Sequence, residues 1–133
     1  MLISDLITIH QKTGIGRLSA FCGATSAGIG AACGIAWLDG GDYEVIAHTI
    51  VNGLAILSGM VCDGAKPSCA AKIATAVRNG LLGYQMYRQG CQFYGGDGIV
   101  TKGVENTIAN VGRLANRGMR STDCEILNIM IGN

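Results

Sequence analysis

The stretch from Leu18 to Leu38, LSAFCGATSAGIGAACGIAWL, contains no charged side chain and consists mainly of Gly, Ala, Ser and Thr. A helix that is apolar on all sides has to be buried, either in a protein core or in a membrane. Aromatic residues make up only 5% of the chain, which argues against a β-sandwich and favours closely packed small-residue helices. We therefore expect an all-α fold with Gly/Ala-rich buried helices, in a single helical domain over residues 1–133.

A membrane hairpin is the competing interpretation of this stretch. Leu18 to Leu38 is long enough to span a bilayer, and Val45 to Cys62 forms a second apolar run interrupted by His48 and Asn52. However, the small residues of the first run contribute little transfer free energy, and the run lacks an aromatic belt and a basic cluster at one end. We therefore favour a protein without a membrane partner.

Hydrophobic periodicity and helix end signals predict about six helices. They are expected at residues 4–12, from beyond Gly16 to about 38, 42–58, 68–89, 102–117 and 122–130. Asp42 is expected to cap the third helix, and Thr122 with Glu125 to form a capping box for the last one. The Gly-rich segment 91–100 lacks the Lys-Ser/Thr of a phosphate-binding loop, so a plain connector is the favoured interpretation.

The net charge and the cysteine content exclude some classes of function. The net charge of +1 and the pI of about 7.6 provide no electrostatic footprint for nucleic acid or for a membrane surface. The opening residues Met1 to Asp5 do not resemble a signal peptide, so we expect a cytoplasmic protein. Its six cysteines are then expected to be reduced thiols used for metal binding, catalysis or core packing, rather than three disulfides.

Two of these cysteines flank a short turn in SGMVCDGAKPSC, residues 58–69. Cys62 is expected just after one helix and Cys69 in the first turn of the next, so the turn can bring both sulfurs toward one point. A helix N-terminus lowers the pKa of a thiol, and the thiolate is the form that binds metals. The spacing matches neither a zinc nor a ferredoxin pattern, so two buried thiols that never meet are the alternative. His10 and His48 are expected at the surface or as satisfied core residues.

Three segments together resemble one family: LSAFCG, SGMVCDGAKPSCAAKIATAV and GGDGIVTKGVENTIANVGRLANRGM. They are similar to the carboxy-terminal part of the serine dehydratase-like family, in particular its L-cysteine desulfidase branch. The resemblance covers essentially the whole chain, and M-V-C-D-G-A-K-x-x-C is its specific motif. It implies a PLP-independent lyase that uses a [4Fe–4S] cluster to eliminate sulfide from L-cysteine, or water from L-serine. The products would be pyruvate and ammonia.

The same resemblance implies a set of cluster ligands. Cys22, Cys62 and Cys69 correspond to the three cysteines that hold the cluster in the family. Cys33, in the context ACGI, competes for the third place. Cys91 and Cys124 match no motif and are interpreted as structural.

The turn between Cys62 and Cys69 is expected to support the sulfurs. The backbone N–H groups of Asp63–Lys66 are predicted to hydrogen-bond to them and so to tune the cluster. Lys66 is interpreted as a solvated turn residue rather than as a ligand of the substrate carboxylate.

The chain also departs from the family pattern, because family members are much longer. Their amino-terminal part holds a further cysteine proposed as the base and a Gly-rich substrate loop, and neither has a counterpart here. We therefore expect the cluster-binding portion of a longer enzyme, inactive alone and requiring the missing amino-terminal half or a partner subunit. Exposed apolar surface would favour a homo-oligomer. The alternative function is a metal-free helical scaffold or interaction subunit.

Overall fold

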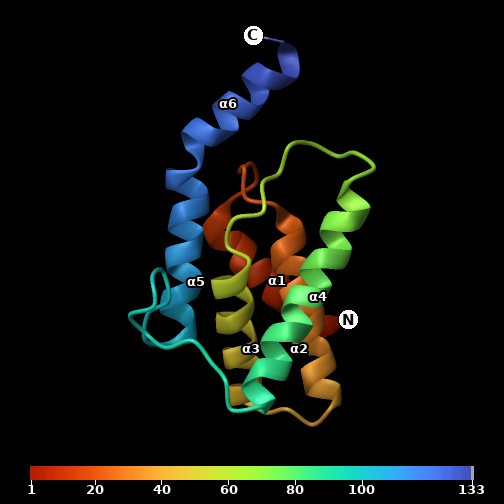
Figure 1. Cartoon of the computed structure of the whole chain (residues 1–133), viewed down its shortest axis with the longest axis vertical. Helices are drawn as coiled ribbons and strands as arrows, with labels where there is room; N and C mark the ends of the chain where they lie inside the picture. The colour runs from red at the N-terminus through yellow and green to blue at the C-terminus, as the bar shows by residue number, and fades with distance from the viewer. Residues whose placement is uncertain (133) are drawn as a thin grey trace.

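The computed structural model describes residues 1–132, which form six α-helices and one π-helical turn joined by loops (Figure 1). The helices are α1 Leu2–Ile15, α2 Gly23–Leu38, α3 Tyr43–Ile56, α4 Cys69–Arg88, α5 Val104–Arg113, the π-helical η1 Leu114–Gly118, and α6 Arg120–Ile131. The expected all-α fold of about six helices is confirmed. Within residues 1–132, no helix combines the length and the apolar character that crossing a membrane requires.

Helix α2 is the central element, and its small residues let its neighbours approach its backbone. A Cβ atom on Gly28 would lie 2.3 Å from the carbonyl carbon of Ala76 in α4, and one on Gly30 would lie 2.6 Å from the carbonyl oxygen of Ser4 in α1. Gly80 of α4 faces α2 in the same way, since a Cβ atom on Gly80 would lie 2.8 Å from Ala32 Cβ. The expected Gly/Ala-rich buried helix is therefore present, and glycine is required where the helices touch.

The contacts between α2 and α4 show that these helices run parallel. Gly28 meets Ala76 and Ala32 meets Gly80, so both contacts join residues that are 48 positions apart (76 − 28 and 80 − 32). The contacts advance in the same direction along both helices, so the N-termini of the two helices lie at the same end of the molecule (Figure 1). The loops at residues 16–22 and 57–68 lie at that end, whereas the loop at residues 89–103 lies at the other.

The core fills the space between α1, α2, α3 and α5. Its buried side chains are Ile15, Phe21, Ile29, Cys33, Ile50, Leu54, Ile108, Val111 and Ala115. Two buried asparagines join α3 to α4 through polar contacts. Asn52 Nδ2 donates to the Gly83 carbonyl at 3.0 Å, and Asn79 Nδ2 donates to the Gly53 carbonyl at 2.9 Å. These bonds satisfy the two side-chain Nδ2 groups and the two helix carbonyls, and they fix the register of α3 and α4.

Several helix ends differ from the sequence-based prediction. The first helix does not end at Gly14 but continues to Ile15. Gly14 packs against Gly112 of α5. The second begins at Gly23, because the residues before it are held in an extended conformation. The Thr122 capping box is wrong, since α6 already begins at Arg120. The Asp42 cap is confirmed: its carboxylate accepts a hydrogen bond from the Val45 N–H at 3.2 Å.

We predict that Gly28→Ala lowers the free energy of unfolding by about 1–3 kcal/mol, because the added methyl group would collide with the α4 backbone. The matched control is Gly34→Ala in the same helix, where a Cβ would meet nothing within 4 Å. That control should raise the free energy of unfolding by roughly 0.5–1 kcal/mol, since alanine is the better helix former. Urea denaturation measures both. Equal effects of the two substitutions would contradict the close α2–α4 contact.

Candidate metal centre

An isolated antiparallel β-bridge between Phe21 and Val61 positions the first two cysteines. The Cys22 N–H donates to the Met60 carbonyl at 2.9 Å, and the Cys62 N–H donates to the Ala20 carbonyl at 2.6 Å. Cys22 and Cys62 are therefore diagonal neighbours on one face of the bridge, a relation in which side chains lie about 7–8 Å apart. The bridge joins two loops that are distant in sequence and brings their thiols together.

The third cysteine, Cys69, is the first residue of α4. Cys22 is the N-cap of α2, and both helices begin at the end of the molecule that carries the loops at residues 16–22 and 57–68 (Figure 1). Cys22 and Cys69 both act electrostatically on Lys72 of α4, so both thiols lie within electrostatic reach of its ammonium. Both thiols lie where unpaired backbone N–H groups and the helix dipoles favour negative charge.

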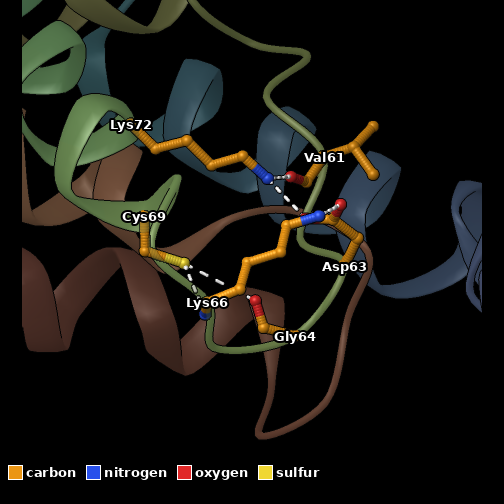
Figure 2. A network of polar contacts seen from close by, with 6 residues as sticks. All are labelled: Val61, Asp63, Gly64, Lys66, Cys69 and Lys72. Atoms are coloured by element: carbon orange, nitrogen blue, oxygen red, sulfur yellow. Dashed lines mark hydrogen bonds and ion pairs between the residues drawn. The ribbon is translucent and has the colours of Figure 1, made fainter.

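The turn between Cys62 and Cys69 wraps around the Cys69 sulfur (Figure 2). The Lys66 backbone N–H donates to Cys69 Sγ at 3.4 Å, and Cys69 Sγ donates to the Gly64 carbonyl at 3.5 Å. Gly64 has φ +91°, a left-handed conformation that glycine adopts without strain. The turn therefore supplies a backbone N–H to a sulfur, as the sequence predicted, and the contact is shown here for Lys66 and Cys69.

A charged network holds this turn against α4. Asp63 pairs with both Lys66 and Lys72, and the Lys72 Nζ lies 2.6 Å from Asp63 Oδ1 (Figure 2). Lys72 Nζ also donates to the Val61 carbonyl at 2.7 Å, next to the β-bridge. Hydrogen bonds first from Lys66 and then from Lys72 lower the pKa of Asp63 to about 2, against a small effect of desolvation.

Lys72 links the network to the cysteines. Its pKa is raised, first by the hydrogen bond to Asp63, while partial desolvation opposes the shift. The negative charges of Asp63, Cys22 and Cys69 contribute in the same direction as that hydrogen bond. Two lysines and one aspartate leave an excess of one positive charge beside the thiols.

The other three cysteines lie elsewhere. Cys33 is fully buried in the core, where burial raises its pKa to about 12. It is eleven residues beyond Cys22, or about 16 Å along the axis of α2 at 1.5 Å per residue. The structure therefore brings Cys22, and not Cys33, to the cysteine turn. Cys91 and Cys124 are both exposed, so neither packs in the core, and their structural role stays a prediction.

Neither histidine contributes to this centre. His10 is exposed and its Nε2 lies 2.7 Å from Glu105 Oε2, whereas His48 stacks on Tyr87 with ring centroids 4.5 Å apart. Among residues 1–132, no three His, Cys, Asp or Glu side chains are grouped as ligands of a metal ion. An iron–sulfur cluster does not need such a group, because each thiolate binds a different iron of the cluster. All six cysteines are free thiols.

Sequence reasoning missed two residues of this centre. Lys72 follows Cys69 by three positions, which places it on the same side of α4, and this spacing was the available signal. Met130 comes from the far end of the sequence: a Cβ on Gly64 would lie 3.5 Å from Met130 Cε. The end of α6 thus lies beside the cysteine turn, an arrangement that no local motif indicates.

These features define a class of protein: an all-helical fold with a cysteine-containing turn at the end where α2 and α4 begin. The family model of the serine dehydratase alpha chain matches residues 1–128, and the chain belongs to this family.

The chain is also similar to several curated bacterial proteins named UPF0597 protein. It is 66% identical to one from Desulfitobacterium hafniense over 131 residues, which are 98% of this chain and 30% of that relative. Identity is 50% to one from Treponema denticola and 42% to one from Bacteroides fragilis, with the same coverage. The chain thus spans about 30% of the length of these relatives. No solved structure matches it.

We predict that the Asp63 carboxyl of the metal-free chain titrates near pH 2, below its ordinary value of 3.8. Because the folded-state pKa is lowered, the pairing stabilises the turn above pH 3.8 and is lost as the pH falls toward 2. Carbon-detected NMR measures the midpoint. Lys66→Met and Lys72→Met should each raise it, whereas Lys102→Met, at the other end of the molecule, should not. A midpoint near 3.8 in the unsubstituted chain would show that the network does not form.

Proposed function

We propose that this chain is the iron–sulfur cluster-binding portion of a lyase that eliminates sulfide from L-cysteine, or water from L-serine. Pyruvate and ammonia would be the products. Membership of the serine dehydratase alpha chain family supports a lyase-type role and a serine dehydratase-like subunit. The observation that supports the proposal is the β-bridge that joins the segments of Cys22 and Cys62, with Cys69 at the N-terminus of α4 after the turn that follows Cys62.

In this proposal, Cys22, Cys62 and Cys69 hold a [4Fe–4S] cluster. The surroundings fit such a group, because they offer thiols, two helix N-termini, a backbone N–H on Cys69 Sγ and an excess positive charge. When bound through three cysteines, the cluster supplies an iron with an open coordination position that acts as a Lewis acid.

The residues around the thiols have distinct tasks in this proposal. Lys72 fixes the shape of the turn, because its Nζ contacts both the Val61 carbonyl and Asp63. The Lys66 backbone N–H directs Cys69 Sγ, while its ammonium is occupied by Asp63. The excess positive charge would also attract the carboxylate of an amino acid substrate.

The base that removes the α-proton is assigned to the part of the enzyme that this chain does not span. Asp63 is poorly suited to this role, because its lowered pKa makes it a weak base at neutral pH. Lys72 holds its proton in a hydrogen bond with Asp63. We therefore propose that the amino-terminal half of the family polypeptide, or a partner subunit, completes the active site.

A metal-free helical scaffold is the second candidate function. The observation in its favour is that residues 1–132 contain no ready-made group of metal ligands. Anaerobic iron analysis separates the two functions, since the scaffold predicts no iron under any condition.

We expect anaerobic reconstitution with iron and sulfide to give a brown protein with a broad visible absorption band. Cys22→Ala, Cys62→Ala and Cys69→Ala should each abolish the band and the bound acid-labile sulfide, because each removes one ligand. Cys91→Ala and Cys124→Ala are matched controls that should retain both. Retention in Cys22→Ala with loss in Cys33→Ala would assign the third ligand to Cys33 instead.

We expect the reconstituted chain alone to release pyruvate and sulfide from L-cysteine only near the background rate. General-base catalysis contributes about 10²–10⁴-fold, and this chain offers no suitable base. Addition of the remaining part of a full-length relative should restore turnover, measured anaerobically as pyruvate and sulfide. Rapid turnover by the chain alone would place the base within these residues and contradict this division of labour.

A further inference from the structure

Within residues 1–132, the second half of α2 presents an exposed face beside the start of α1. Ala31, Gly34, Ile35 and Leu38 are spaced i, i+3, i+4 and i+7, so they form a single apolar stripe along the second half of the helix. Ile35 is 40% exposed and Leu38 is 84% exposed. This stripe lines a groove of about 810 Å³, and residues 1–5 form its other wall. We call it the α1/α2 groove.

Helix α1 exposes apolar side chains as well. Leu2, Leu6 and Ile9 are spaced i, i+4 and i+7, and they are 81%, 65% and 64% exposed. Of these three, Leu2 lines the α1/α2 groove. Exposed apolar side chains gathered in a groove mark an interaction site.

Gly34 indicates what kind of structure covers the groove. Two other interior glycines of α2, Gly28 and Gly30, each face the backbone of a neighbouring helix, where a side chain would collide. At Gly34 a Cβ would meet nothing within 4 Å. Glycine inside a helix costs roughly 0.5–1 kcal/mol relative to alanine. Its presence at the centre of an apolar stripe fits a further helix that approaches the α2 backbone as closely as α1 and α4 do.

We propose that the α1/α2 groove binds an α-helix from the part of the family polypeptide that this chain does not span. The chain covers 30% of the length of its relatives, so most of their polypeptide lies outside it and is available to cover the groove. Apolar anchors at i, i+3, i+4 and i+7 are how a groove recognises an amphipathic helix. This docking site rests on the proposed function, because both make the chain one portion of a longer enzyme.

A helix of the same polypeptide is favoured over a second copy of this chain. A tethered segment has an effective concentration in the millimolar range, whereas a second copy loses its full translational and rotational freedom on binding. In the relatives the segment is part of one chain with the groove, so it would occupy the groove first.

The test compares this chain alone with a full-length protein in which its residues replace the matching segment of the Desulfitobacterium hafniense relative. Hydroxyl-radical footprinting with mass spectrometry measures the solvent access of Leu2, Trp37 and Leu38. We expect all three to be modified readily in the chain alone and several-fold more slowly in the full-length protein. Equal modification in both would overturn the proposal. Protection that develops in the chain alone as its concentration rises would assign the groove to a second copy and also overturn it.

Gly34→Leu provides a second measurement. In the chain alone it should not lower the thermal unfolding temperature, because the side chain enters open space and leucine is a better helix former than glycine. In the full-length protein it should re-expose Leu2 and Leu38, since overpacking a helix contact costs about 1–3 kcal/mol, or roughly 5–150-fold in docking. Ala109→Leu, another small-to-Leu change at an exposed helix position, is the matched control and should preserve the protection. Undiminished protection in Gly34→Leu would count against a closely docked helix.

Neither measurement depends on iron. A colourless full-length protein with a protected groove would support the docking site and reject the cluster. A brown protein with an exposed groove would do the reverse.

Discussion

The parallel contact between α2 and α4 is the constraint on which the rest of this structure depends. Gly28 and Gly80 allow the two backbones to touch, and the touching residues set a fixed register between the helices. Because the two helices run in the same direction, both N-termini lie at one end of the molecule (Figure 1). The positive ends of two helix dipoles and two lysines are gathered there, and Asp63 neutralises one of the two lysine charges. An anionic cluster bound at that end would supply further negative charge.

The sequence predicted the helical class and the cysteine turn because both have local causes. An uncharged Gly/Ala-rich run requires burial, and a turn that contains Lys66-Pro67 precedes α4 in the way that helix signals indicate. The start of α2 was mispredicted because residues 18–22 have the same small-residue composition as the helix after them. The bridge from Phe21 to Val61, a tertiary interaction, holds them extended. Composition carries no signal for a contact between segments 40 residues apart (61 − 21).

The choice between Cys22 and Cys33 shows the same limit at the level of the site. Both lie in similar Gly/Ala-rich surroundings, and the motif alone left them as alternatives. The rise of the helix separates them, because Cys22 lies at the N-cap of α2, whereas Cys33 lies about three turns further along the helix and is buried in the core. Lys72 was missed for a related reason: its contact with Val61 depends on how the intervening turn folds. The ligand cysteines belong to a motif, whereas the residues that orient them are brought in by tertiary structure.

Helix α2 also connects the two proposals in physical terms. Cys22 is the N-cap of α2, and the middle of the helix packs between α1 and α4. The second half of the helix contains the apolar stripe around Gly34. The stripe and the cysteine turn therefore lie toward opposite ends of one rigid helix. A helix docked in the α1/α2 groove would fix the remainder of the enzyme to this chain without covering the thiols. The cysteine end would then stay open to the substrate and to the base that the remaining polypeptide has to bring there. Because of this separation, we expect a substitution in the groove to weaken docking while leaving the thiols in place.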